Sequence, residues 1–280
     1  MKQIINFQQV ESNIIDADLQ SVYKYRDWQN DFHKRIITHK EVWFAHPHKL
    51  NDPFDMRAPL QFDFSQVNWN TVRDKIKDAG RYQEPNLSEE ELEVQVESRY
   101  REMMSNPDAY FRKNRSSYIA EEAHYNRLGL FSCCKTAENE SMWAHYGNNH
   151  TGFAIGFNTV ELLRSLNCTI GVVVYDDTPI TYYPMAPTDD IDMKEMFQKS
   201  TKWAAEEEVR FITSGIGIYK KRDDIFSNSA VKEIVFGINT SEKHQDEIRE
   251  AASITIPNIP FYKLSKQTDS YGFQKNRIND

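Results

Sequence analysis

Residues 141–157 read SMWAHYGNNHTGFAIGF, which predicts a short helical turn, a loop and then an apolar strand. Trp143 and Tyr146 are three residues apart, so in a helical turn their side chains lie together while His145 points elsewhere. We expect Trp143 to anchor the turn on a sheet. His145 and Tyr146 are the better functional candidates, because residues 147–149 form a loop beside them. They are expected to face a cleft.

Other short strand patterns recur along the chain. A strongly helical pattern at residues 193–206 is expected to run directly into the strand EVRFIT, and another helix is expected to begin near residues 240–241. In NDFHKRIITHK, the side chains of Phe32, Ile36 and Ile37 share one helical face. Many short strands with few helices predict an α+β fold with a mixed, mainly antiparallel sheet. The expected strands are VYKYR (22–26), EVWFA (41–45), LGLFSCC (128–134), TIGVVVY (169–175), EVRFIT (208–213), VKEIVFGI (231–238), IPFYKLS (259–265) and SYGFQKNRI (270–278).

A charged, helical stretch interrupts these strands at residues 68–126. Ser88 and Glu91 form a capping box, and Asn106-Pro107 breaks the stretch into two helices. We expect a single domain over residues 1–280 with this stretch as a helical insertion, serving as a lid or an interaction surface.

The composition limits the class of partner. The net charge is -8, the pI is about 5.6 and the mean hydropathy is -0.70, so bulk attraction to nucleic acid or an anionic membrane is not indicated. A basic run at residues 110–118 could touch a nucleic-acid backbone, but such runs are more often a solvated helix face. Residues 1–19 lack the apolar core of a secretory signal, and three cysteines without a framework indicate free thiols. A cytoplasmic protein with no membrane segment is expected.

Two acidic side chains in KWAAEEEVRF are the first candidate site. If a strand starts near Glu206, then Glu206 and Glu208 project from the same face, because side chains alternate along a strand. Their repulsion would raise one pKa and suit acid–base work. A solvated charge run at the end of a helix is the alternative interpretation.

The strand VYKYR is the second candidate. Tyr23 and Tyr25 share one face, and Lys24 and Arg26 share the other. Such a strand can present a stacking ring and an anion clamp. An ordinary edge strand with one solvated face is the alternative.

Two further chemistries are weaker. His46 and His48 form an H-x-H pair in a proline-containing loop without further metal-ligand spacing, so no metal site is expected. Cys133 or Cys134 with His145 has the residue types of a thiol nucleophile. A strand, however, is not the usual position for an activated thiol.

Several of these stretches, taken in order, resemble a bacterial domain-of-unknown-function family, number two-nine-seven-one. The matching segments are VYKYR, VWFAHPHKLNDPFD, LFSCCK, MWAHYGNNHTGFAIGF, VVVYD and WAAEEEVRF. The layout is also distantly similar to the ADP-ribosyltransferase superfamily. There a first-strand histidine or arginine helps to hold NAD, a serine or tyrosine follows, and a glutamate completes the site, in one branch as E-x-E.

The resemblance implies a set of site residues. Lys24 stands where many members of that superfamily carry histidine. By position the resemblance implies Lys24 or Arg26 on the first strand, Ser132 or Tyr146 later, and Glu208 with Glu206. Together with the residues singled out above, the expected catalytic residues are Glu208, Glu206, Tyr146 and His145. The expected NAD-binding residues are Tyr23, Lys24, Tyr25, Arg26, Asn51, Asp52 and Ser132.

The function implied is an NAD-using transferase or NAD glycohydrolase, in the setting of a toxin or a phage-defence effector. The acceptor is left open between protein, nucleic acid, a small molecule and water. A catalytically inactive sensor or interaction module is the first alternative, and a cysteine hydrolase is the second.

Overall fold

The protein is described by a computed structural model that covers residue 14 and residues 18–119, 125–184 and 189–278. The prediction that residues 1–19 lack a secretory signal falls mostly outside the described residues. Residues 120–124 of the expected insertion also lie outside them. Among the described helices, none has the length and apolar character needed to cross a bilayer.

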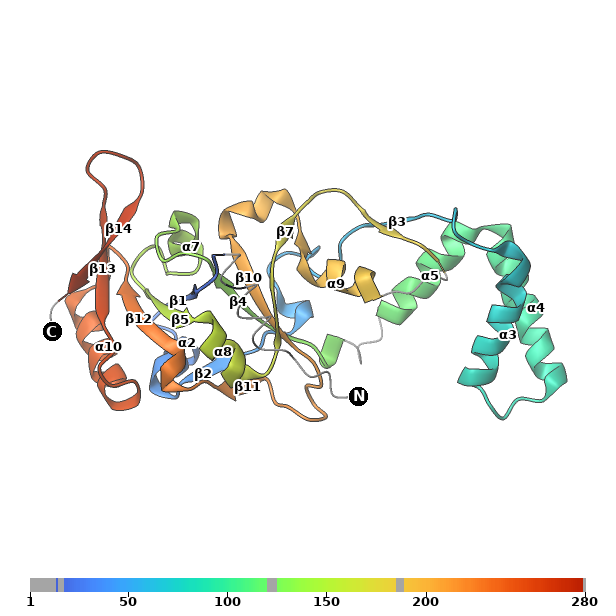
Figure 1. Cartoon of the computed structure of the whole chain (residues 1–280), viewed down its shortest axis with the longest axis horizontal. Coiled ribbons are helices and arrows are strands. Elements are labelled where there is room, and N and C mark those ends of the chain that lie inside the picture. The colour runs from blue at the N-terminus through green and yellow to red at the C-terminus, as the bar shows by residue number, and fades with distance from the viewer. Residues whose placement is uncertain (1–13, 15–17, 120–124, 185–188, 279–280) are drawn as a thin grey trace.

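An eight-stranded sheet forms the centre of the molecule (Figure 1). Only β12 and β13 pair in parallel within it, and the other neighbours are antiparallel. The expected α+β class with a mixed, mainly antiparallel sheet is therefore confirmed. In spatial order the strands are β14 (Phe273–Ile278), β13 (Phe261–Lys266), β12 (Val231–Phe236), β5 (Phe153–Asn158), β1 (Ser21–Arg26), β4 (Gly129–Cys134), β10 (Glu208–Thr213) and β6 (Thr169–Val172).

Short strand pairs surround this sheet. They are β2 (Glu41–Trp43) with β11 (Asp223–Ile225), β3 (Leu60–Phe62) with β8 (Ile180–Tyr182), and β7 (Val174–Tyr175) with β9 (Gln198–Lys199). The body carries helices α2 (Asp31–Thr38), α7 (Glu140–His145), α8 (Thr159–Leu166), α9 (Asp189–Phe197) and α10 (Glu242–Thr255), and the 3-10 turns η1 (Pro47–Lys49), η3 (Thr201–Glu206) and η4 (Asn228–Ala230).

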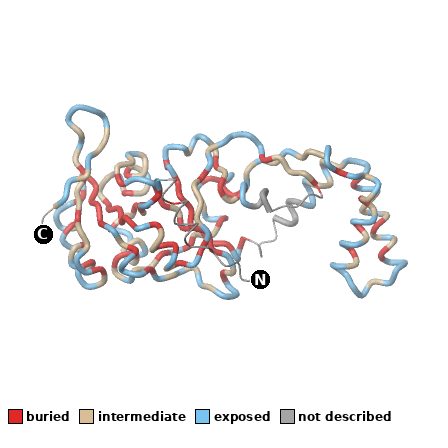
Figure 2. Tube along the Cα trace, viewed as in Figure 1, coloured by how far each residue is buried: buried red, intermediate tan, exposed pale blue. Residues whose placement is uncertain are grey.

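Buried residues run along the strands of the sheet (Figure 2), and the buried apolar side chains form separate clusters on its two faces. On one face, α2, α8 and α10 contribute Ile37, Leu162 and Ile248 to the main core. On the other face, Tyr23 and Tyr25 pack with residues of α7, β12 and β13. This confirms that the two tyrosines of VYKYR share a face.

The helix expected in NDFHKRIITHK is present as α2, where Ile36 and Ile37 are buried and Phe32 is 84% exposed. One other helix expectation is wrong in detail. The helix expected over residues 193–206 ends at Phe197, and β9 and η3 follow it. Ser200 caps η3 by accepting from the Lys202 N–H, which starts a new element where the composition alone favours a continuous helix.

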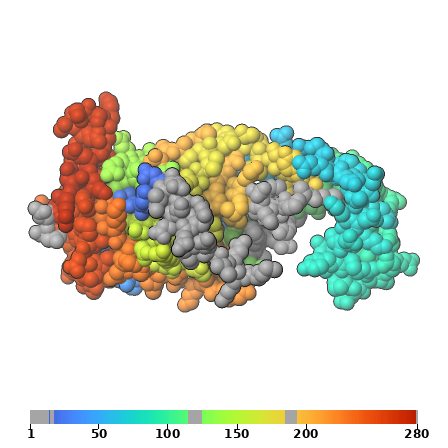
Figure 3. All heavy atoms as spheres, viewed as in Figure 1, coloured from blue at the N-terminus to red at the C-terminus, as the bar shows by residue number. Residues whose placement is uncertain are grey.

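The charged stretch forms an arm of helices that projects from the body (Figure 3). Its elements are η2 (Trp69–Thr71), α3 (Val72–Gln83), α4 (Glu89–Ser105) and α5 (Pro107–Ile119), so there are three α-helices where two were expected. The capping box of Ser88 and Glu91 and the break at Asn106-Pro107 are confirmed. The arm has its own apolar cluster, which includes Ile76 and Leu92. The single-domain assignment stays a prediction.

The sheet opens between β1 and β4. β1 pairs with β5 along its whole length but pairs with β4 at one position, Tyr23 with Cys134. Beyond that position Lys24 donates a hydrogen bond from its ammonium group to the backbone carbonyl of Ser132. At the far end of β4, Leu130 exchanges backbone hydrogen bonds with Ala45. A wedge is left between the two strands.

Trp143 fixes α7 on the sheet, as expected of a packing anchor. Its side chain is fully buried, its indole N–H donates to the Ala137 carbonyl at 2.7 Å, and its ring meets Tyr25 edge-on at 5.0 Å. A Cβ at Gly147 would lie 2.6 Å from the indole, so the chain after α7 needs glycine to pass this ring.

Trp143→Ala should lower the free energy of unfolding by about 3–5 kcal/mol, as large aromatic truncations in a core do. Urea unfolding followed by circular dichroism measures this change. Tyr271→Ala is the matched control, because the Tyr271 ring is fully exposed and its loss should leave stability within about 0.5 kcal/mol of wild type. Equal effects of the two substitutions would contradict the assignment of Trp143 as the anchor.

Candidate functional site

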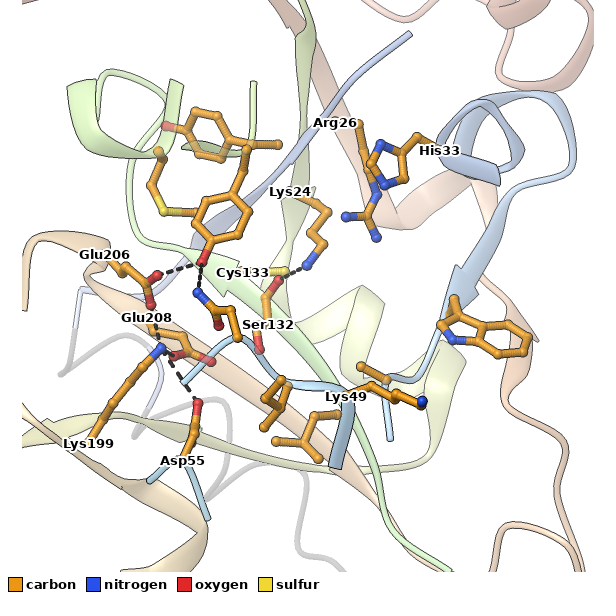
Figure 4. Close-up of a pocket in the computed structure, with 18 of the residues that line it drawn as sticks. Lys24, Arg26, His33, Lys49, Asp55, Ser132, Cys133, Lys199, Glu206 and Glu208 are labelled. Atoms are coloured by element: carbon orange, nitrogen blue, oxygen red, sulfur yellow. Dashed lines mark hydrogen bonds and ion pairs between the residues drawn. The ribbon is translucent and has the colours of Figure 1, made fainter. Parts of the chain in front are cut away.

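A cavity of about 410 Å³ lies in the wedge between β1 and β4 (Figure 4). This volume is within the range of small-molecule sites, about 300–1,000 Å³. We call it the first cavity. Its lining includes Lys24, Tyr25, Arg26, Phe32, His33, Trp43, Lys49, Asn51, Asp55, Ser132, Cys133, Met142, Tyr146, Lys199, Glu206 and Glu208.

A buried ionic network closes one end of the first cavity. Lys199 Nζ lies 2.6 Å from Glu206 Oε2, 3.2 Å from Glu208 Oε2 and 3.5 Å from Asp55 Oδ2. Arg210, which is fully buried, binds Glu208 through Nε at 2.8 Å and reaches Asp55 at 2.7 Å. When ionised, the three carboxylates exceed the two cations by one negative charge. This is the acidic end of the cavity.

Glu206 and Glu208 meet, but not because both are on a strand. Glu206 is the last residue of η3, and β10 begins at Glu208. Between them Glu207 adopts a left-handed conformation with φ 46°, which is uncommon outside glycine and asparagine. Asn139, the N-cap of α7, holds this turn by donating to the Ala205 carbonyl at 2.7 Å and to the Glu207 carboxylate at 3.1 Å. The helix that carries Trp143 and the acidic turn are thus tied together.

Repulsion between Glu206 and Glu208 was expected to raise the pKa of one of them, but the pKa of Glu208 is lowered. Burial alone would raise its pKa, but Arg210, Lys199 and a hydrogen bond from Ser132 lower the pKa to about 2. Burial would likewise lower the pKa of Lys199, yet Glu208, Asp55 and Glu206 raise it. Burial is the main reason that the pKa of Asp55 is raised, against the opposing effect of Arg210. Glu208 and Lys199 are therefore both charged at neutral pH.

Tyr146 links the acidic end to the loop NDPFD (residues 51–55). Its hydroxyl donates to Glu206 Oε1 at 2.6 Å and accepts from Asn51 Nδ2 at 3.0 Å. Burial and the Glu206 carboxylate raise the pKa of Tyr146, so it stays a neutral donor. Asn51 and Asp55 both come from this loop. One short segment therefore binds Tyr146 and also supplies a carboxylate of the ionic network.

The opposite end of the first cavity is basic. Lys24 and Arg26 point into it from β1, and His33 approaches Arg26 from α2 (Figure 4). Burial and the charge of Arg26 lower the pKa of Lys24 to about 7, and burial lowers the pKa of Arg26 to about 10. Burial and the two cations lower the pKa of His33 to about 4. His33 Nδ1 accepts from the Asp27 N–H at 3.3 Å, which leaves Nε2 as an N–H donor.

The cavity brings together most of the residues singled out from the sequence. They are Lys24, Tyr25, Arg26, Asn51, Ser132, Tyr146, Glu206 and Glu208. Three others lie outside its lining. The Tyr23 hydroxyl instead donates to the buried Glu233 at 2.8 Å, on the far side of β1. Asp52 faces a different cavity, and His145 is turned away by the helical spacing that places Tyr146 inside.

Sequence reasoning missed four residues of this site. Lys199 falls in the stretch interpreted as helix, and His33 in α2 gave no signal. Asp55 stands in the quoted loop NDPFD but was not selected. Arg210 had a usable signal, because a lone arginine in the otherwise apolar strand EVRFIT requires a buried partner.

The geometry of the first cavity favours a carboxylate site over a thiol nucleophile or a metal site. Cys133 lines the cavity, but burial raises the pKa of both Cys133 and Cys134 to about 12, which keeps them as thiols at neutral pH. The Nε2 atom of His46 forms a hydrogen bond with Asn126 Oδ1 at 2.8 Å. Across the described part of the chain, no group of three or more histidine, cysteine, aspartate and glutamate side chains is arranged to hold a metal ion.

Comparison with known proteins gives one match. Residues 142–211 match the family described as Protein of unknown function (DUF2971). The matched stretch runs from α7 to β10 and contains Tyr146, Lys199, Glu206, Glu208 and Arg210, and it supports the family resemblance drawn from the sequence. No curated protein and no solved structure matches the chain. Similarity to ADP-ribosyltransferases has no support from these comparisons and stays a prediction.

The lowered pKa of Glu208 predicts a specific acid sensitivity. Its value in the folded protein, about 2, lies below the ordinary 4.5, so the ionised carboxylate contributes stability above about pH 4.5. That contribution, about 3 kcal/mol, is lost as the pH falls towards 2. The difference in unfolding free energy between wild type and Glu208→Gln should therefore shrink steadily between about pH 5 and pH 2.5 in urea titrations.

Glu207→Gln serves as the control, because the Glu207 side chain is exposed and its bond is to Asn139. Its unfolding free energy should follow wild type across the same range. A Glu208→Gln difference that does not change with pH would refute the ionic role assigned to this carboxylate.

Proposed function

We propose that the protein cleaves the N-glycosidic bond of NAD, as a glycohydrolase or as an ADP-ribosyl transferase. The observation that carries the proposal is the division of the first cavity into an acidic end and a basic end. NAD has the matching division, with a cationic nicotinamide ribosyl group at one end and an anionic diphosphate next to it.

The acidic end suits the bond that breaks. Loss of nicotinamide leaves an oxocarbenium-like centre, and a fixed carboxylate stabilises the positive charge as it develops. Glu208 is held in place by Arg210 and Lys199 and remains ionised, and the network carries one excess negative charge when all three of its carboxylates are ionised. In this role Glu208 stabilises the developing cation, and Tyr146 keeps Glu206 oriented beside it.

The basic end suits the diphosphate. The Arg26 guanidinium has no hydrogen-bond or ion-pair partner within the described residues and lines the cavity, so its donors are available to phosphate oxygens. Lys24 and the Nε2–H of His33 add donors next to it. Phe32 and Trp43 line the same cavity and are 84% and 54% exposed, which gives aromatic faces on which a base can stack.

One observation favours a binding module without catalysis. Both oxygens of Glu208 already accept hydrogen bonds from Arg210, and the Glu208 carboxylate also faces Lys199, so part of its negative charge is neutralised before any ligand arrives. Such a module would bind NAD or a related nucleotide in the same cavity and leave it intact.

Release of nicotinamide from NAD by the purified protein, followed by chromatography, tests the proposal. Glu208→Gln should reduce turnover roughly a hundredfold or more, as loss of a stabilising group in a closed site does. Glu207→Gln should keep wild-type turnover. Arg26→Ala should raise KM for NAD at least tenfold, because a charge-assisted contact to phosphate is lost. Circular dichroism checks that each variant is folded.

The outcomes separate the two candidate functions. A rise in melting temperature with NAD but no nicotinamide release would support the binding module. Neither a shift nor release at millimolar NAD would refute both.

Cys133→Ser separates the carboxylate mechanism from a thiol mechanism. Turnover should survive this substitution, because the Cys133 thiol is protonated at neutral pH and the proposed chemistry needs no nucleophilic sulfur. Loss of turnover with an unchanged circular dichroism spectrum would favour the cysteine hydrolase instead.

A further inference from the structure

A second cavity, of about 320 Å³, adjoins the first one and shares Lys199 with it. The loop NDPFD contributes to both: Asn51 and Asp55 line the first cavity, and Asp52 and Phe54 line the second. The opposite side of the second cavity comes from Asp176 and Asp177, which follow β7, and from Trp203 of η3.

Asp52 is the central feature of the second cavity. The residue is 6% exposed, and its Oδ1 accepts the Phe54 N–H at 2.9 Å. Its Oδ2 is buried without a hydrogen-bond partner in the described part of the chain. A buried carboxylate oxygen without a donor is unfavourable by about 1–3 kcal/mol or more, so the site is set up to receive a donor.

The charges around Asp52 require that donor to be positive. Asp177 accepts hydrogen bonds from Ser200 and Thr201, and Asp176 accepts one from the Thr178 N–H, but none of these donors is a cation. Lys199 is already held by its own three carboxylates. Lys202 also lines the second cavity, and its charge helps to lower the pKa of Asp177, but it is exposed and forms no ion pair within 4 Å of another described residue, and it is one cation against three aspartates. The carboxylates of the second cavity therefore exceed its available cations.

The walls of the second cavity select an organic cation over a bare ion. Phe54 is 60% exposed beside the cavity, and the Trp203 ring lies 5.0 Å from Lys199 Nζ, already in contact with an ammonium group. Aromatic faces attract ammonium and guanidinium groups and bury their alkyl chains. No three ligating side chains of the described residues are placed to hold a metal ion here.

We propose that the second cavity binds an organic cation, a primary ammonium or guanidinium group on a short aliphatic chain, with Asp52 Oδ2 accepting its hydrogen bond. The binding is independent of any NAD chemistry in the first cavity. Because the two cavities share one loop, the bound cation lies against the back of the segment that supplies Asn51 and Asp55.

Titration of the protein with n-butylammonium and with n-butylguanidinium tests this proposal, using a sample in which tryptophan alone carries nitrogen-15. The indole signal of Trp203, assigned from Trp203→Phe, should shift saturably with at least one of the two cations and not with n-butanol. The two cations distinguish ammonium from guanidinium recognition. Repeating the titration at higher salt separates this binding from general attraction to an acidic protein.

Two variants and a control complete the test. Asp52→Asn keeps the size of the side chain and should weaken binding at least tenfold, because the charge that pairs with the cation is gone. Phe54→Leu should weaken it roughly threefold. Asp269→Asn, at an exposed aspartate in the loop between β13 and β14, should bind as wild type does. Binding that Asp52→Asn leaves unchanged, equal binding of n-butanol, or no shift of the Trp203 signal would each overturn the proposal.

Discussion

The site depends on the ion pairs that the ammonium group of Lys199 forms with three carboxylates. The ammonium group lies within 4 Å of these carboxylates, which come from a loop near residue 55, from η3 and from β10, and it reaches them from a two-residue strand beside β7. Burying a lysine is costly unless its charge is matched, and here the match comes from Glu206 and Glu208, seven and nine residues further along the chain, and from the distant Asp55. Without Lys199, Arg210 would be the one remaining cation of the network against three buried carboxylates.

The second cation, Arg210, continues this arrangement along the sheet. It is fully buried, and its guanidinium joins Glu208 to Asp55 while a further N–H donates to the Met196 carbonyl at 2.8 Å. In the strand EVRFIT the apolar side chains Val209 and Phe211 enter the main core, and Glu208 and Arg210 face the network. One short strand therefore supplies both packing and polar chemistry.

The fold was largely predictable because its strands are short and apolar with clear turns, and period-two patterning is a local property. The contact between Tyr146 and Glu206 could be predicted from the sequence only in part. The helical turn of Trp143 and Tyr146 was readable, whereas the left-handed Glu207 was not, because nothing in three successive glutamates marks the middle one for a positive φ. Lys199 was hidden for a related reason: its neighbours favour helix, and only the tertiary partners of its side chain make a buried strand position favourable.

Lys24 joins the two halves of the sheet where the backbone ladder between β1 and β4 is missing, through its bond to the Ser132 carbonyl. Its pKa of about 7 means that the proton is gained or lost within the physiological range. A neutral amine still has N–H groups, so the link to Ser132 persists in either state. Small changes in acidity therefore alter the electrostatic potential that a ligand meets in the wedge while the frame around it keeps its shape.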